Sequence, residues 1–278
     1  MRRTRRHRVV RLSADGSSRA RADVLAGEEP MELRVDGTPW TVTMRTPGED
    51  FDLALGFLVS EGVVWESGQV AEIGYGPGVS ADGSSTYNVV EVRLAPGVAP
   101  PDTSHERHVY TSSSCGICGT ASIDAVSRTA RVPVADDDVR VPLAELLAMT
   151  GRLRDDQRLF SHTGGVHAAG LFRLDDAGSA ELLCLREDVG RHNAVDKVVG
   201  WALREHGLPL RRCVLQVSGR ASFELVQKAR LAGIAVLSAV SAPSALAVEL
   251  AAEAGMTLVA FSRGDSANVY AGAERIVG

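Results

Sequence analysis

The chain has few cysteines, almost no lysine and no long apolar segment. Four cysteines in 278 residues are too few to suggest a disulfide-rich secreted domain. No apolar run approaches the roughly 20 residues that a membrane-spanning helix needs. No apolar core follows the arginines at the start of the chain, so no secretion signal is indicated either. The sequence therefore predicts a protein of the reducing cytoplasm.

Lysine occurs only at Lys197 and Lys228, so arginine is the usual cation of this chain. The formal net charge is −5 at pH 7, which implies no broad basic surface for nucleic acid. We interpret the opening run MRRTRRHR as a solvated, mobile tail, although a transit peptide or an arm that touches an acidic partner has the same composition. Residues 1–29 are therefore predicted as a flexible arm, with 13–29 as a loose linker, and the fold is expected to begin near Pro30.

Several motifs of known chemistry are missing. There is no Gly-x-x-x-x-Gly-Lys-Ser/Thr and no Gly-x-Gly-x-x-Gly after a strand. The usual sequence motifs for ATP hydrolysis and for dinucleotide redox chemistry are therefore missing. A zinc deaminase needs His-x-Glu with Pro-Cys-x-x-Cys, but no His-x-Glu occurs and Ser114 precedes Cys115. Cys184 and Cys213 stand alone in apolar runs, as core residues do. We therefore expect no structural zinc.

The most informative feature present is the thiol pair Cys115 and Cys118 in SSSCGICG, ahead of a helix-like run over 120–130. A helix N-terminus lowers the pKa of a thiol, and the thiolate is the nucleophilic form. Both cysteines are therefore candidate catalytic residues for sulfur transfer. By itself the pattern is also compatible with half a zinc site, a structural bridge or a dithiol-disulfide oxidoreductase, which is the alternative function.

The arrangement of apolar segments predicts an α/β protein with a smaller α+β part at 30–110 and a larger part at 111–278. In the smaller part we expect a hairpin over 32–44, a helix from the capping-box pattern Thr46-Pro47-Gly48-Glu49 to Gly62, and a strand over 87–94. In the larger part, strand-like and helix-like segments alternate, which predicts parallel strand-helix units. The strands are expected at 182–185, 214–217, 234–240 and 257–261, and the helices at 189–206, 221–232 and 243–254.

Polar loops follow these strands at 186–191, 218–222, 241–244 and 262–266. Because the carboxyl ends of parallel strands meet at one edge of a sheet, we expect the loops to form a crevice there. Their glycine, serine and arginine residues, beside helix N-termini, suit a phosphate-bearing ligand such as a nucleotide. For His167, and for His192 with Asn193, a ligand contact and a structural role both stay open.

Together these segments resemble one family, the formate dehydrogenase accessory sulfurtransferases known as FdhD. Residues 1–29 and 76–85 offer no shared motif. The resemblance is carried by TP at 46–47, ALGF at 54–57, SEG at 60–62, CGICG at 115–119, TGGVHAA at 163–169, REDVGRHNAVDK at 186–197, SGRAS at 218–222, VQK at 226–228, SAP at 241–243 and TLVAF at 257–261.

The resemblance implies a cytidine-deaminase-like mixed sheet with covering helices, commonly in a homodimer and without the deaminase zinc site. It also implies a sulfur carrier that receives sulfane sulfur from a cysteine desulfurase as a persulfide. The sulfur would pass to the molybdenum cofactor, bis(molybdopterin guanine dinucleotide), of a formate dehydrogenase catalytic subunit. No nucleic-acid or membrane partner is implied. A non-catalytic nucleotide-binding chaperone for an enzyme subunit is a third class to distinguish from sulfur transfer and dithiol redox chemistry.

Specific residues follow from the same resemblance. The persulfide position maps to Cys115, with Cys118 as a supporting thiol. GDP is expected to mimic the nucleotide end of the cofactor. The cofactor-binding stretch maps to Phe261, Ser262, Arg263, Gly264, Asp265 and Ser266.

Overall fold

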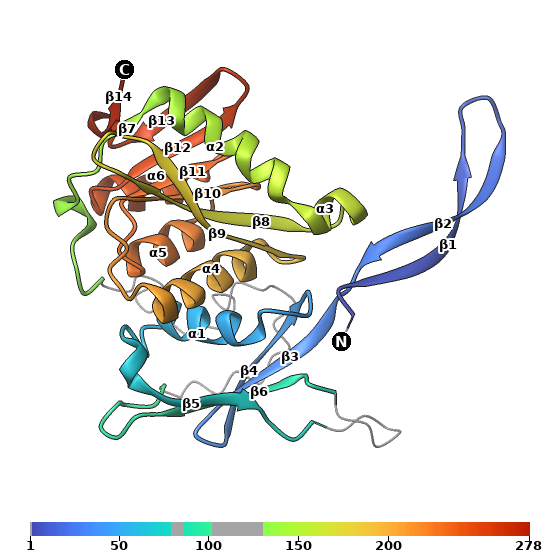
Figure 1. Cartoon of the computed structure of the whole chain (residues 1–278), viewed down its shortest axis with the longest axis horizontal. Coiled ribbons are helices and arrows are strands. Elements are labelled where there is room, and N and C mark those ends of the chain that lie inside the picture. The colour runs from blue at the N-terminus through green and yellow to red at the C-terminus, as the bar shows by residue number, and fades with distance from the viewer. Residues whose placement is uncertain (1, 79–85, 102–129) are drawn as a thin grey trace.

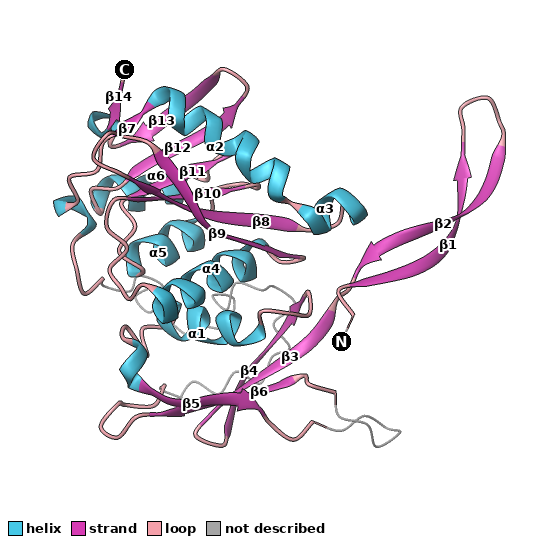
Figure 2. Ribbon diagram, in the orientation of Figure 1, coloured by secondary structure: helices cyan, strands magenta, loops and turns pink. Residues whose placement is uncertain are grey.

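The computed structural model describes residues 2–78, 86–101 and 130–278. Its largest element is a six-stranded mixed sheet in the order β13-β12-β11-β10-β8-β9, seen in Figures 1 and 2. Three neighbouring strands are parallel, and the other pairings are antiparallel. The strands are β8 (His167–Leu174), β9 (Ala180–Asp188), β10 (Cys213–Val217), β11 (Val236–Ala239), β12 (Thr257–Arg263) and β13 (Ser266–Ala271).

Helices cover both faces of this sheet, which explains why its central strands are buried and mostly apolar, with Gln216 and Ser238 as the polar residues of β10 and β11. All residues of β10 and β11 are buried. One face is covered by α4 (Arg191–Glu205), α5 (Phe223–Leu231) and α6 (Ala245–Glu253), and the other by α2 (Leu143–Asp156), as Figure 1 shows. The predicted α/β class and the four predicted strands are confirmed, and the three predicted helices are α4 to α6.

A second, four-stranded sheet in the order β4-β3-β6-β5 forms the smaller part of the molecule. The predicted hairpin and helix are present, and α1 lies between this sheet and α4 (Figure 1). The elements are β3 (Glu29–Val35), β4 (Thr38–Arg45), α1 (Asp50–Ser60), β5 (Val70–Tyr75) and β6 (Val89–Leu94).

The predicted capping box at Thr46 is wrong. The N-cap of α1 is Glu49, in the left-handed region and with no side-chain cap. The Thr46 hydroxyl instead accepts a hydrogen bond from the amide of Val189, 3.0 Å away. A contact between distant segments has replaced the local one that the motif predicted.

An N-terminal arm is present, but the predicted loose linker over 13–29 is wrong, because Ser18–Ala26 forms a strand. Strands β1 (Thr4–Leu12) and β2 (Ser18–Ala26) pair in register along their full length and project from the body (Figure 1). The turn is closed by the Ser17 amide, which donates to Asp15 Oδ1 at 2.9 Å, and Gly16 has φ +81°. The segment lacks a buried face, so the hydrophobic pattern that reveals most strands is absent.

The remaining described elements are short. They are β7 (Val141–Pro142), which pairs with β14 (Ile276–Val277), α3 (Arg158–Thr163), and three 3₁₀ turns, Ser67–Gln69, Val134–Asp136 and Ala273–Arg275. The predicted boundary between residues 110 and 111 lies outside the described residues and stays a prediction. Across the described ranges, none of the helices is long and apolar enough to span a membrane.

Candidate functional site

The carboxyl ends of four strands lie at one edge of the large sheet, as predicted. Strand β8 is antiparallel to both β9 and β10, so β9 has the same direction as the parallel group β10, β11 and β12. The loops that follow these four strands therefore share an edge with the start of β8, where His167 lies opposite Asp188. In open α/β sheets this edge is where ligands bind.

A pocket of about 570 Å³ opens at this edge. The ends of β9, β10 and β11 contribute Val189, Ser218 and Val240, and β8 contributes His167. Ser218 also fixes the strand beside it, because its hydroxyl accepts a hydrogen bond from the Ala168 amide at 2.9 Å. The opposite wall comes from α2, α3 and the turn after α3, with Thr150, Arg154, Gln157, Phe160, Gly164, Gly165 and Val166.

The α2–α3 wall of the pocket was not predicted. Residues 143–162 carry no motif, and only their place beside the TGGVHAA block at 163–169 could have drawn attention to them. The Arg154 guanidinium lies over the Phe160 ring, 4.2 Å from its centroid, and makes a planar wall element. Such a surface can stack against a flat heterocyclic ring.

Glu187, predicted in a ligand loop, has a structural role here. Its buried carboxylate accepts hydrogen bonds from the amides of Leu159 and Phe160, at 2.7 and 2.8 Å. These are unpaired donors of the first turn of α3. Glu187 therefore holds the helix that forms the pocket wall.

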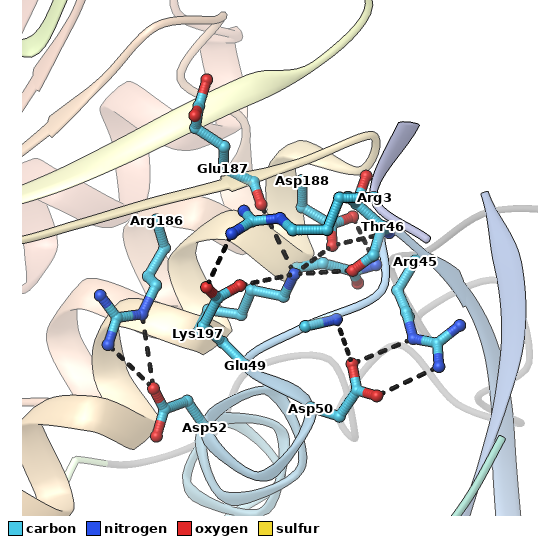
Figure 3. Close-up of polar contacts among 12 residues, drawn as sticks. Arg3, Arg45, Thr46, Glu49, Asp50, Asp52, Arg186, Glu187, Asp188 and Lys197 are labelled. Atoms are coloured by element: carbon cyan, nitrogen blue, oxygen red, sulfur yellow. Dashed lines mark hydrogen bonds and ion pairs between the residues drawn. The ribbon is translucent and has the colours of Figure 1, made fainter. Parts of the chain in front are cut away.

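The neighbours of Glu187 also bind protein groups, as Figure 3 shows. Arg186 is paired with Asp52 of α1 at 3.0 Å. Asp188 is paired with Lys197 of α4 at 2.8 Å, with both side chains fully buried. The Asp188 carboxylate also accepts from the amides of Thr46 and Gly190. These contacts join the end of β9, next to the pocket residue Val189, to α1, α4 and the segment that follows β4.

His192 and Asn193 are buried and contact protein atoms. His192 Nε2 lies 3.4 Å from Ser222 Oγ and 3.7 Å from Glu224 Oε2. Asn193 donates to the Met44 carbonyl at 2.8 Å and to Asp188 at 3.1 Å. The structure therefore favours a structural role for both residues over a ligand contact.

His167 is half-buried and faces the pocket. Burial, with the nearby charge of Arg191, lowers the pKa of His167 below its ordinary value. The ring is therefore neutral at pH 7 and can both donate and accept one hydrogen bond. This suits a polar heterocycle better than a phosphate group.

Groups suited to an anion follow the pocket residues Val189 and Ser218 in the chain. Neither Gly190 at the start of α4 nor Ser222 at the start of α5 gives a side-chain cap to its helix. Within the described residues, the buried Nε of Arg191 has no hydrogen-bond partner. Helix N-termini and guanidinium groups both favour negative charge.

The predicted cofactor stretch Phe261–Ser266 is a tight hairpin rather than a loop, because β12 extends to Arg263 and β13 starts at Ser266. Ser262 is fully buried, and its carbonyl accepts a hydrogen bond from Thr150 Oγ1 at 3.1 Å. Thr150 lines the pocket, so this contact joins the hairpin to the pocket wall. Arg263, Gly264 and Asp265 are exposed at the same edge.

The candidate catalytic cysteines Cys115 and Cys118 lie outside the described residues. The other two cysteines are buried and free, as predicted. Burial raises the pKa of the Cys184 thiol to about 12 and raises that of Cys213, so neither forms a thiolate at neutral pH. Over the described ranges there is no cluster of three or more His, Cys, Asp or Glu that could hold a metal ion.

The buried Lys197–Asp188 pair allows a prediction about the stability of the site. Lys197→Met leaves the Asp188 carboxylate buried without its cation and should lower the free energy of unfolding by about 3–5 kcal/mol. Urea denaturation followed by circular dichroism measures the loss. The double variant Lys197→Met/Asp188→Asn removes both charges and should recover most of it. A single variant no less stable than the double would contradict this account of the pair.

The fold and the site together define a class: a mixed α/β protein with a ligand pocket at the carboxyl edge of its sheet. Residues 26–277 match the model of the FdhD/NarQ family. The chain belongs to the FdhD/NarQ family.

Relatives and a solved structure agree with this assignment. The chain is 60% identical over 274 residues to the "Sulfur carrier protein FdhD" of Streptomyces coelicolor, covering 98% of this chain and 95% of the relative. It is 56% identical over 276 residues to the protein of the same name from Mycobacterium tuberculosis, covering 98% of each. A crystal structure from Desulfotalea psychrophila, described as that of a formate dehydrogenase accessory protein, superposes with a TM-score of 0.71 over 99% of both chains at 24% identity. That likeness supports the fold.

Proposed function

We propose that this protein is a sulfur carrier for the maturation of formate dehydrogenase. The observation that carries the proposal is its 60% identity, over nearly the whole chain, to a protein named as a sulfur carrier. The pair Cys115 and Cys118 supplies the nucleophiles that such a role requires, since the other two thiols are buried with raised pKa values. The proposed donor is a cysteine desulfurase, and the proposed acceptor is the molybdenum cofactor of the catalytic subunit.

Sulfur loading is a thiol exchange. The Cys115 thiolate attacks the terminal sulfur of the desulfurase persulfide, the S–S bond of that persulfide breaks, and the desulfurase cysteine leaves as a thiolate. Cys115 then carries the persulfide, and no electrons are gained or lost overall. For release as sulfide, the Cys118 thiolate attacks the Cys115 sulfur, HS⁻ leaves, and a Cys115–Cys118 disulfide forms. A dithiol reductant then restores both thiols.

The pocket and the Phe261–Ser266 hairpin are proposed to receive a guanine nucleotide end of the cofactor. The Arg154–Phe160 surface and the neutral His167 ring suit a flat polar heterocycle. The N-termini of α4 and α5 and the unpartnered Arg191 Nε suit its phosphates. We further propose that the protein works as a homodimer.

The test of the sulfur-carrier role is mass spectrometry of the intact protein and its peptides after incubation with a cysteine desulfurase and L-cysteine. A gain of one sulfur atom on the peptide that contains Cys115 is the expected result. Because sulfide release also leaves a Cys115–Cys118 disulfide, the same incubation is repeated with Cys118→Ser, which cannot form it. No sulfur gain on Cys115 in that variant, together with a Cys115–Cys118 disulfide in the wild type, would instead indicate a dithiol-disulfide oxidoreductase.

Arg263→Ala tests the cofactor stretch. Loss of a guanidinium bound to phosphate should raise the Kd for GDP about tenfold, as measured by isothermal titration calorimetry. Arg140→Ala is the matched control, because Arg140 is exposed and donates to the carbonyls of Asp138 and Val139. An unchanged Kd in the Arg263 variant would remove this hairpin from the site.

A further inference from the structure

The N-terminal hairpin, residues 2–26, differs in charge from the rest of the molecule; we call it the arginine arm. It contains eight arginines and two aspartates, for a formal charge of +6. Because the whole chain carries −5, the remaining residues carry −11. One polypeptide therefore presents a strongly basic projection and a strongly acidic body.

The root of the arm is attached firmly to the body. Arg3 is paired with Glu49 at 3.1 Å, and Arg5 with Glu29 at 3.1 Å. The Gly27 amide donates to the Arg3 carbonyl at 2.7 Å. Beyond this root, the hydrogen bonds and ion pairs recorded among the described residues stay within the arm. The arm projects away from both sheets (Figure 1).

One face of the arm has the composition of a protein interface. Side chains alternate along a strand, so Arg6, Arg8, Val10 and Leu12 share a face. Their register partners on that face are Val24, Ala22, Ala20 and Ser18, so it contains no carboxylate. Val10 is 64% exposed and Leu12 is 76% exposed.

An isolated two-stranded hairpin is at best marginally stable in water, because it cannot bury enough apolar surface. The arm has two exposed aliphatic side chains at its outer end and nothing described in this chain that covers them. Such a hairpin gains stability when a second surface covers its apolar face. The covering surface must also accept uncompensated arginines.

We infer that the arginine arm docks on the acidic body of a second copy of this chain. The two copies have complementary charges, +6 on each arm and −11 on each body. With two-fold symmetry each arm reaches the other body, so the contact is made twice and the assembly closes as a dimer. The inference rests on the proposed homodimer and goes beyond it by naming the surface that makes it.

The first test is analytical ultracentrifugation of the full-length protein. Wild type should be a dimer whose dissociation constant rises with salt concentration. Arg6→Glu/Arg8→Glu should raise that constant at least about tenfold, because it places like charges against the acidic body. The matched control Arg93→Glu/Arg140→Glu makes the same charge change on exposed body residues and should leave the dimer intact.

The second test locates the contact in the wild-type background. A photo-crosslinking amino acid at Leu12, in a mixture of ¹⁴N- and ¹⁵N-labelled protein, should give intermolecular crosslinks to residues outside 2–26. A monomer at all concentrations, or a dimer that Arg6→Glu/Arg8→Glu does not weaken, would overturn the inference. Crosslinks that join one arm to the other arm would also overturn the inference. The proposed loading of Cys115 with sulfur does not involve the arm. A Cys115 that took up no sulfur would therefore count against the proposed function and not against this inference.

Discussion

A Cys115→Ser variant is expected to take up no sulfur from a cysteine desulfurase and to leave formate dehydrogenase without activity. Serine has nearly the same shape as cysteine, but its hydroxyl does not ionise at neutral pH and forms no persulfide. The expected loss is therefore complete rather than graded. The measurement is sulfur transfer from ³⁵S-labelled cysteine, followed by an assay of formate dehydrogenase that has matured with the variant.

Two controls separate a loss of sulfur transfer from a loss of nucleotide binding or of folding. The Kd for GDP should be unchanged in Cys115→Ser, because the pocket and the Phe261–Ser266 hairpin are proposed to bind the nucleotide. Cys118→Ser should still accept sulfur and should fail only at its release. A dithiol oxidoreductase would lose its activity with either substitution, and a non-catalytic chaperone would tolerate both. Normal maturation with Cys115→Ser would exclude the sulfur-carrier proposal.

The elements that could be predicted from the sequence are those whose pattern reflects burial. Strands β10, β11 and β12 are mostly apolar on both faces because helices cover both faces, so each appears as a short segment dominated by hydrophobic residues. The position of the ligand edge followed from their direction alone. The pocket beside Ser218 and His167 lies where that reasoning placed it.

The features that could not be predicted depend on contacts between distant segments. The Glu187 and Asp188 side chains look like ligand-loop residues, but their partners lie in α3, α4 and the segment before α1. Thr46 fits a local capping motif, yet its hydroxyl binds Val189, far away in sequence. In each case, local sequence indicates a polar group but not which distant donor or acceptor will reach it.

The strands of the arm could not be predicted for a different reason. Hydrophobic periodicity detects strands that have a buried face, and β1 and β2 have none. Which side chains of β2 share a face with Arg6, Arg8, Val10 and Leu12 is known only from the register of the two strands. The side chains of the hairpin are exposed, so hydrophobic periodicity did not predict its strands. This exposure is also the basis for the proposed role of the hairpin as a docking surface.

Gly200→Ala is expected to destabilise the protein severely, by more than about 3 kcal/mol. Gly200 of α4 and Gly56 of α1 lie where these helices cross. A Cβ at Gly200 would overlap the Asp52 carbonyl oxygen and would lie 2.7 Å from the Gly56 amide nitrogen. The obstacles are backbone atoms, which no rotamer change can move, so the helices would have to separate. Urea denaturation measures the loss, and Gly56→Ala, which meets the Asp196 backbone, should behave alike.

Gly151→Ala is the matched control, because Gly151 lies in α2 and a Cβ there meets nothing within 4 Å. With free space, alanine should stabilise the protein by about 0.4–1 kcal/mol, through the higher helix propensity and the smaller entropy of the unfolded chain. The two substitutions are chemically identical and differ only in what surrounds the added methyl group. A similar effect of Gly200→Ala and Gly151→Ala would mean that α1 and α4 do not cross as closely as described. The ion pairs that fix the end of β9 depend on that crossing, since their partners Asp52 and Lys197 lie on these two helices.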